Sequence, residues 1–306
     1  MARPLTIEPV DATFGAVVTG FRIAGIDDET FQALYDAWLK YALLIFPDQH
    51  LTREQQIAFA KCFGPLEFEM TALSNVKDDG TLRLEKDNDD RMKILKGNMG
   101  WHADSTYMPV QAKGAVFCAE EVPTIGGHTG WADMRAAYDA LDDATRTKVE
   151  GLSAYHSLHY SQSKLGHDTR QEKADGEYSG YGLSNKGPVP LRPLVKTHPE
   201  TGRKSLLIGR HAHNIPGMDK DESERFLEGL VAFACQRPRT WHHDWRPGDA
   251  VIWDNRCLLH QATPWDMTQR RIMWHSRIAG DPASELALNQ DPSTIVSRAP
   301  SVSARV

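Results

Sequence analysis

A short polar stretch, Trp101-His102-Ala103-Asp104, places the strongest restriction on how this chain can fold. In an extended backbone, residues two positions apart project to the same face, so the imidazole of His102 and the carboxylate of Asp104 would point to one place. Two histidines and one carboxylate on one face of a metal leave three adjacent positions open. That arrangement suits a non-haem Fe(II) that must also bind a co-substrate and O2. We therefore expect a second histidine to fold back onto this stretch.

His260 is the candidate for that second histidine. It ends segment 251–260, an apolar run that is typical of a strand entering the interior. The tripeptide His-x-Asp also occurs by chance, and the chain holds 13 histidines, so composition alone does not decide the choice. His156, His159 and His167 are possible ligands by composition, but none lies on an apolar run that is followed by an arginine.

Arg271 is the arginine that follows His260, eleven residues later and within an apolar run. Burying an arginine there is costly unless an anion accompanies it. The sequence therefore predicts a metal site with an anion-binding arginine nearby.

The pattern of short strands and scattered helices is typical of a mainly β protein with flanking helices. Helices are predicted at 28–41, 52–62, 133–141, 143–149 and 219–234, and strands within 5–26 and at 42–46, 114–119, 205–208 and 251–260. This order is not the βαβ alternation of a parallel sheet, and it fits a jelly-roll barrel with helices packed outside. We expect one domain over 1–306, with lid insertions near 70–97 and 155–190 and a flexible tail at 285–306.

Composition narrows the range of partners. The formal net charge is −6 and no Lys/Arg run is present, so we expect no nucleic-acid partner. No apolar run approaches the roughly 20 residues of a membrane span, and the first residues lack a signal-peptide core, so we expect no membrane partner either. The four cysteines are scattered without a CxxC motif, which favours reduced thiols in the cytoplasm. We also expect a homo-oligomer.

Four blocks of this sequence match one family in the right order. They are Asn98-x-x-Trp101-His102-x-Asp104, Gly126-Gly127-His128-Thr129-x-Trp131, Trp253-Asp254-Asn255-Arg256-x-x-x-His260 and Arg270-Arg271-Ile272-Met273. The chain resembles the taurine/2,4-dichlorophenoxyacetate dioxygenases, and most closely their aryloxyalkanoate (phenoxypropionate) branch. The resemblance runs from about residue 5 to 280.

The resemblance implies a fold, a chemistry and a set of site residues. The fold would be a double-stranded β-helix, the jelly-roll form that cupins share, with a metal at one mouth of the barrel. The cofactors would be Fe(II), 2-oxoglutarate as co-substrate, and O2. His102, Asp104 and His260 would bind the metal. Arg271 and Thr129 would hold the distal carboxylate of 2-oxoglutarate, which is converted to succinate and CO2.

The substrate residues are where this sequence departs from the taurine branch. Members that act on taurine carry an arginine four residues after the 2-oxoglutarate arginine, and here His275 stands at that place. On a strand, Arg271, His275 and Arg277 would share one face. Arg277 and Arg210 are therefore the candidates for binding a substrate carboxylate, with Asn98 and His275 as further contacts. A small aryloxy acid then fits better than taurine, and hydroxylation beside its ether oxygen would release a phenol and a 2-oxo acid.

Three alternatives stay open at this point. The same chemistry could act on a sulfonate such as taurine. A His-Asp-His site could instead hold Zn²⁺ and activate water for hydrolysis, although zinc would not explain Arg271 and Thr129. The barrel could also bind a ligand without turnover, although a complete metal triad argues against this.

Overall fold

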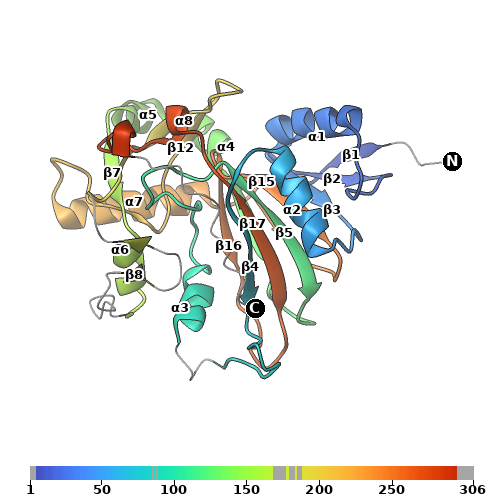
Figure 1. Cartoon of the computed structure of the whole chain (residues 1–306). Helices are drawn as coiled ribbons and strands as arrows, with labels where there is room; N and C mark the ends of the chain where they lie inside the picture. The colour runs from blue at the N-terminus through green and yellow to red at the C-terminus, as the bar shows by residue number, and fades with distance from the viewer. Residues whose placement is uncertain are drawn as a thin grey trace.

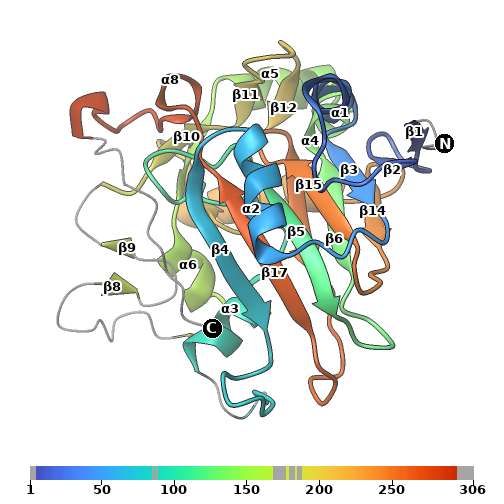
Figure 2. The same cartoon turned by 45° about the vertical axis from the view of Figure 1, so that its right-hand side comes forward.

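The computed structural model describes residues 5–84, 86, 89–167 and 188–294, together with the backbone of two short strands, β8 (Glu177–Tyr178) and β9 (Leu183–Ser184), which pair with each other. Strands at the centre are covered by helices on both sides (Figures 1 and 2). This arrangement confirms the predicted jelly-roll class with helices outside.

The main sheet holds seven strands, and it supplies one wall of the barrel. In spatial order they are β1 (Thr6–Pro9), β2 (Ala16–Thr19), β3 (Leu43–Phe46), β15 (Ala250–Asp254), β5 (Gly114–Glu121), β17 (Ile272–Ile278) and β4 (Leu66–Ser74). All neighbours are antiparallel except β2 and β3. The register of β17 shifts between His275 and Arg277, a bulge of the kind that re-aims side chains beside functional sites.

A second sheet forms the facing wall. It consists of β14 (Thr240–His243), β6 (Thr129–Asp133) and β16 (Leu258–Ala262), with β6 in the middle. Trp131 of β6 lies 6.0 Å from Trp253 of β15, measured between ring centroids, so large aromatic side chains fill the space between the two sheets. Further short strands lie outside the barrel: β7 (Ser153–His156), β10 (Leu191–Pro193), β11 (Val195–Thr197), β12 (Lys204–Leu206) and β13 (Ala212–His213).

Helices form the outer layers. The outer face of the main sheet packs against α1 (Asp28–Tyr41) and α2 (Arg53–Cys62), and the outer face of the second sheet packs against α4 (Met134–Asp139) and α7 (Lys220–Ala234). The remaining helices are α3 (Asp90–Gly97), α5 (Asp143–Glu150), α6 (Leu158–Ser163), α8 (Pro282–Glu285) and the 3-10 turn Pro292–Thr294. Thr52 and Gln55 form a capping box with both reciprocal hydrogen bonds, and it fixes the start of the predicted helix α2.

Two sequence predictions need correction here. The apolar run 251–260 is not one strand, because Asp254, Asn255 and Arg256 turn the chain from β15 in the main sheet into β16 in the second sheet. The flexible tail does not begin at 285, because Glu285 and Ala287 are 1% and 2% exposed. Residues 295–306 of that prediction lie outside the described residues.

The described parts of the two predicted lid insertions contain helices. The first begins within β4, a strand of the main sheet, and it ends with α3, whose Met92 and Leu95 pack against Trp265. The second contains β7 and α6, while most of 168–187 lies outside the described residues. Helix α3 and helix α6 contact each other, and each supplies a residue that lines a cavity, Leu95 from α3 and Leu158 from α6.

Candidate active site

Three side chains from two distant parts of the sequence meet inside the barrel. One ligand atom each of His102, Asp104 and His260 lies within 4.8 Å of the others, and all three residues are buried. These three residues, called the metal cluster below, are the ones that the sequence predicts as metal ligands. Two imidazoles and one carboxylate form a donor set that suits Fe(II). Asp104 Oδ2 is buried and has no hydrogen-bond partner among the described residues, so it remains available to a cation.

The two histidines are held together by their own backbones. His102 N donates to His260 O at 3.0 Å, and His260 N donates to His102 O at 2.7 Å. This antiparallel bridge extends the second sheet by one pair and brings the two imidazole centroids to 4.2 Å. The Nδ1 of His102 lies 2.7 Å from Gly100 O, an acceptor, so this nitrogen carries the proton and Nε2 presents its lone pair.

The pKa shifts of the three residues favour the protonation states that bind a cation. Burial, followed by neighbouring His260, lowers the pKa of His102 well below its ordinary value. Burial also lowers the pKa of His260. For Asp104, burial alone would raise the pKa, but Arg277 and the nearby histidines outweigh it and hold that pKa well below its usual range. Near neutral pH the site therefore offers two neutral imidazoles and one carboxylate.

Asn255 fixes the backbone of Asp104. Its Oδ1 accepts from Asp104 N at 2.7 Å, and its Nδ2 donates to Asp104 O at 2.8 Å and to Ala112 O at 2.9 Å. Asn255 stands in the turn between β15 and β16, so the turn that leads to His260 also holds Asp104. In the sequence, Asn255 stands out only as part of a family-matching block, and its residue type alone predicts no such role.

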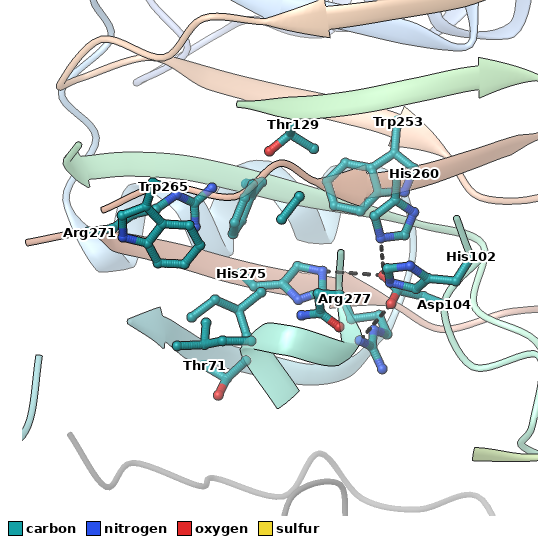
Figure 3. Close-up of a pocket in the computed structure, with 15 residues that line it drawn as sticks. Thr71, His102, Asp104, Thr129, Trp253, His260, Trp265, Arg271, His275 and Arg277 are labelled. Atoms are coloured by element: carbon teal, nitrogen blue, oxygen red, sulfur yellow. Dashed lines mark hydrogen bonds and ion pairs between the residues drawn. The ribbon is translucent and has the colours of Figure 1, made fainter. Parts of the chain in front are cut away.

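A cavity of about 630 Å³, which includes space open to solvent, extends from the metal cluster along the barrel. Figure 3 shows Arg271 and Trp265 at one end and the cluster at the other. Arg271 is 2% exposed, its Nε donates to Gly127 O at 3.2 Å, and its guanidinium lies 5.1 Å from the centre of the Trp265 ring. Burial lowers the pKa of Arg271 to about 10, and none of the described carboxylates pairs with it. A buried cation whose NH2 group has no hydrogen-bond partner in the described part of the chain predicts an anion site.

Thr129 lines the same cavity with its hydroxyl already oriented. Trp245 Nε1 donates to Thr129 Oγ1 at 2.9 Å. An indole nitrogen only donates, so this contact occupies a lone pair of the hydroxyl and leaves its hydrogen to donate elsewhere. The Thr129 hydroxyl can therefore donate a hydrogen bond to the same anion that the positive charge of Arg271 would attract.

Glycine is required at the turn beside Arg271. Gly127 has a φ of +66°, and a Cβ there would lie 3.2 Å from Arg271 Nε. Gly126 has a φ of +77°, and a Cβ there would meet Pro264 O at 2.4 Å. The Gly126-Gly127 turn thus lets the backbone approach the guanidinium closely.

Arg277 is engaged with the metal cluster, which differs from the role that the sequence suggested. Its NH2 group donates to Asp104 Oδ1 at 3.0 Å and its NH1 group donates to Ser105 Oγ at 3.1 Å. His275 does share the inner face with Arg271 and Arg277, and its Nε2 lies 3.6 Å from Asp104 Oδ2. The face that was predicted for β17 is therefore present, but Arg277 points to Asp104.

A second cavity of about 240 Å³ is also lined by His102 and Asp104. Arg210 lines it together with Asn98, His102, Asp104, Tyr107, Leu158, Gln162 and His211. The Arg210 backbone donates to Trp101 O at 2.8 Å, and a guanidinium NH2 group lies 3.3 Å from Ser161 Oγ. Asn98 lines both cavities. Arg210 thus lines the second cavity, and Arg271 lines the first.

Comparison with known proteins decides the family. The family model described as "Taurine catabolism dioxygenase TauD, TfdA family" matches residues 6–277. The chain belongs to the TauD, TfdA family. An (S)-phenoxypropionate/alpha-ketoglutarate-dioxygenase from Sphingobium herbicidovorans is 75% identical over 94% of this chain and 99% of its own length.

More distant TauD, TfdA relatives agree with this placement. An alpha-ketoglutarate-dependent 2,4-dichlorophenoxyacetate dioxygenase from Cupriavidus pinatubonensis is 37% identical over 75% of this chain and 82% of its own length. The crystal structure of AAD-2 in complex with Mn(II) and N-oxalylglycine superimposes with a TM-score of 0.83 at 34% identity, covering 93% of this chain and 100% of that one.

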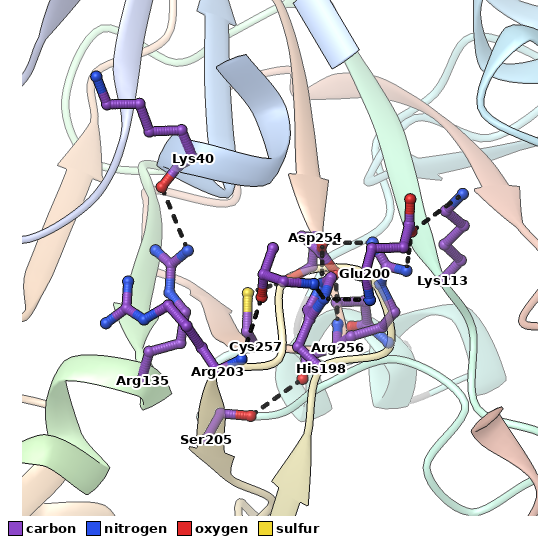
Figure 4. Close-up of polar contacts among 12 residues, drawn as sticks. Lys40, Lys113, Arg135, His198, Glu200, Arg203, Ser205, Asp254, Arg256 and Cys257 are labelled. Atoms are coloured by element: carbon purple, nitrogen blue, oxygen red, sulfur yellow. Dashed lines mark hydrogen bonds and ion pairs between the residues drawn. The ribbon is translucent and has the colours of Figure 1, made fainter. Parts of the chain in front are cut away.

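A second buried cluster in this TauD, TfdA chain does not offer metal ligands. His198, Asp254 and Cys257 lie within 4.8 Å of one another through their ligand atoms (Figure 4). Both oxygens of Asp254 are taken, because Arg256 donates to Oδ1 at 2.8 Å and to Oδ2 at 2.7 Å, and His198 Nε2 lies 2.9 Å from Oδ2. These contacts hold the turn that carries Asn255 in place. Because Asn255 bonds to the backbone of Asp104, they also help to position Asp104.

Proposed function

We propose that this chain is an Fe(II)- and 2-oxoglutarate-dependent dioxygenase that hydroxylates an aryloxyalkanoate at the carbon beside its ether oxygen. One O2 and one 2-oxoglutarate are consumed, and succinate, CO2 and a hydroxylated substrate are formed. The product is a hemiacetal or hemiketal, which breaks its bond to the aryl oxygen and gives a phenol and a 2-oxo acid. The names of two relatives that are 75% and 61% identical support this substrate class.

The observation that carries the proposal is the distribution of charge in the larger cavity. A buried guanidinium with spare hydrogen-bond capacity stands at one end, and three ligating atoms stand at the other. A dianion with carboxylates at both ends of a short chain complements both features. 2-Oxoglutarate is such a dianion, and neither zinc hydrolysis nor simple ligand storage requires it.

The protein's residues divide the work around the cofactor. His102, Asp104 and His260 would hold Fe(II), which supplies the activation of O2 when it is bound. Arg271 and Thr129 would hold the distal carboxylate of 2-oxoglutarate. Trp253 and Trp265 line the cavity between these groups and exclude water from it.

Arg210 is the arginine that we assign to the substrate carboxylate. It faces the second cavity, beside His102 and Asp104, whereas Arg277 already bonds to Asp104 and Ser105. Asn98 borders both cavities and is assigned to the substrate as well, while His275 lies in the larger cavity near Asp104. The substrate and the co-substrate would then approach the metal from different sides.

One experiment tests the reaction and the carboxylate site together. The protein is loaded anaerobically with Fe(II) and 2-oxoglutarate, exposed to O2 with either enantiomer of a phenoxypropionate or its methyl ester, and assayed for succinate and phenol. We expect equal amounts of both products from an acid, and little phenol from the ester. An Arg210→Ala variant should raise the substrate KM with little change in the 2-oxoglutarate KM. Equal turnover of ester and acid would contradict the carboxylate site.

The alternatives predict different products from the same assay. A sulfonate enzyme would release sulfite with taurine and no phenol with aryloxy acids. A zinc hydrolase would need neither O2 nor 2-oxoglutarate, and a binding protein would release no succinate.

A homo-oligomeric, cytoplasmic enzyme completes the proposal. None of the helices in the described part of the chain combines the length and the apolar content that crossing a membrane requires. Light scattering after size-exclusion chromatography measures the number of subunits, and a mass equal to one chain would contradict the oligomer.

A further inference from the structure

Four polar side chains form a connected group behind the metal cluster. Ser105 Oγ lies 3.0 Å and 2.9 Å from the two carboxylate oxygens of Glu67 in β4. Arg277 in β17 reaches Ser105 Oγ at 3.1 Å, Glu67 Oε1 at 3.6 Å and Asp104 Oδ1 at 3.0 Å. Glu67 itself lines neither of the two cavities. It touches no ligating atom, yet it is connected to Asp104 through Arg277.

The two carboxylate oxygens of Asp104 have different surroundings because Arg277 contacts one of them. Arg277 occupies Oδ1, while Oδ2 lies 3.8 Å from His260 Nε2 and 3.6 Å from His275 Nε2 and has no hydrogen-bond partner among the described residues. A carboxylate that turned both oxygens to the metal would occupy one of the positions that a co-substrate and O2 need. The contact with Arg277 opposes that rotation.

The backbone at Ser105 is shaped for this contact. Ser105 is fully buried and has a φ of +56°, in the left-handed region that residues other than glycine seldom adopt. Such a conformation persists where the surroundings hold it in place, and it is found most often at functional sites. Here it places the hydroxyl between Glu67 and Arg277.

We propose that Glu67, Ser105 and Arg277 are positioning residues that keep Asp104 bound to the metal through Oδ2 alone. The carboxylate of Glu67 balances the charge of Arg277, so that Arg277 orients Asp104 without drawing it away from the metal. This inference rests on the proposed function, and it assigns Arg277 to the metal ligand instead of the substrate.

Two variants test the group without touching the metal ligands. Glu67→Gln removes the balancing charge, and Ser105→Gly removes the hydroxyl while suiting the left-handed backbone. Glu69→Gln is the matched control, because Glu69 lies two residues along β4 and pairs with Lys61 at 2.7 Å. Each metal-free protein is titrated with Mn(II), and the EPR signal of free Mn(II) gives the affinity. Thermal unfolding confirms that each variant is folded.

We expect Glu67→Gln and Ser105→Gly to weaken Mn(II) binding by roughly 10-fold or more, as disruption of groups that orient metal ligands commonly does. With Fe(II) at saturation, the ratio of phenol to succinate should also fall, because a misplaced Asp104 spoils the coupling of O2 use to hydroxylation. Folded variants whose Mn(II) affinity and product ratio both match Glu69→Gln would overturn the proposal. If Glu67→Gln does not fold, Ser105→Gly decides alone. The Mn(II) titration needs no turnover, so its result is separate from any failure of the proposed reaction.

Discussion

Two buried arginines near the ends of one strand have opposite surroundings. Arg277 and Arg271 are each 2% exposed, yet Arg277 faces the carboxylates of Asp104 and Glu67, whereas Arg271 meets a backbone carbonyl and the ring of Trp265. Carboxylates of the protein balance the charge of Arg277, whereas none of the described carboxylates pairs with Arg271. Pairing with carboxylates, rather than burial, therefore separates the arginine that we propose as a positioning residue from the one that we propose to bind 2-oxoglutarate.

A third buried arginine supports this reading. Burial lowers the pKa of Arg192 to about 9, as it lowers that of Arg271 to about 10. However, Arg192 donates to the carbonyl oxygens of Thr106, Met108, Pro109 and Glu285. Its hydrogen bonds are satisfied by backbone, so a lowered pKa alone does not mark an anion site.

The largest expected effect comes from removing the metal ligands. His102→Ala and Asp104→Ala should each reduce succinate formation to background, because two protein ligands remain. Asp104→Ala should also lower the free energy of unfolding by about 1–3 kcal/mol, since the buried Arg277 then loses its 3.0 Å contact with a carboxylate. Succinate assays and denaturant titrations measure both effects. Near-wild-type succinate formation in either variant would contradict the ligand assignment.

The next largest effect should come from Arg271→Ala, which, unlike Asp104→Ala, should not lower the free energy of unfolding. Arg271→Ala should weaken 2-oxoglutarate binding by about 2–4 kcal/mol, because a charge-assisted contact to the distal carboxylate is lost. The empty variant should be as stable as the wild type or more so, because a buried charge without a counter-ion is removed. Binding is measured anaerobically at fixed metal, and stability by denaturant titration without 2-oxoglutarate. Unchanged 2-oxoglutarate affinity would remove Arg271 from the site.

A smaller effect should come from the orientation of Thr129. Trp245→Phe keeps an aromatic ring but removes the donor to Thr129 Oγ1, and Thr129→Val removes the hydroxyl. Each should raise the 2-oxoglutarate KM by roughly fivefold, equivalent to about 1 kcal/mol, while the substrate KM stays close to that of the wild type. Because both act through one hydrogen bond, the double variant should be no worse than Thr129→Val. Additive losses would show that Trp245 acts in another way.

The smallest expected effect concerns pH. Burial lowers the pKa of both His102 and His260, so protons compete with a metal only at a lower pH than for ordinary histidines. Mn(II) affinity should therefore stay nearly constant from pH 8 to 6.5 and fall at lower pH. Two independent histidines with the usual pKa of about 6.5 would lose about fourfold over that interval. A fourfold loss in the titration would mean that burial does not set these pKa values.

The sequence predicted the helices α1, α2 and α7 because helix signals are local, and it predicted the jelly-roll class from the order of the elements and from the family resemblance. It also singled out His102, Asp104, His260 and Arg271, since their residue types and apolar settings limit the chemistry. It could not predict that Arg277 turns to Asp104, because that depends on a bulge in β17 and on Glu67 arriving from β4. It likewise missed the break at Asp254, where an apolar run continues through a turn that is held by buried ion pairs.

The backbone bridge between His102 and His260 bears on how the barrel opens. The two residues lie far apart in the sequence, and their pairing joins the segment after α3 to the edge of β16. A metal bound by both side chains would stabilise this backbone pairing, since separating the two segments would also break the metal's coordination. Local opening there should then be rarer with metal than without it, and the amides of His102 and His260 should exchange their hydrogens more slowly in the loaded protein.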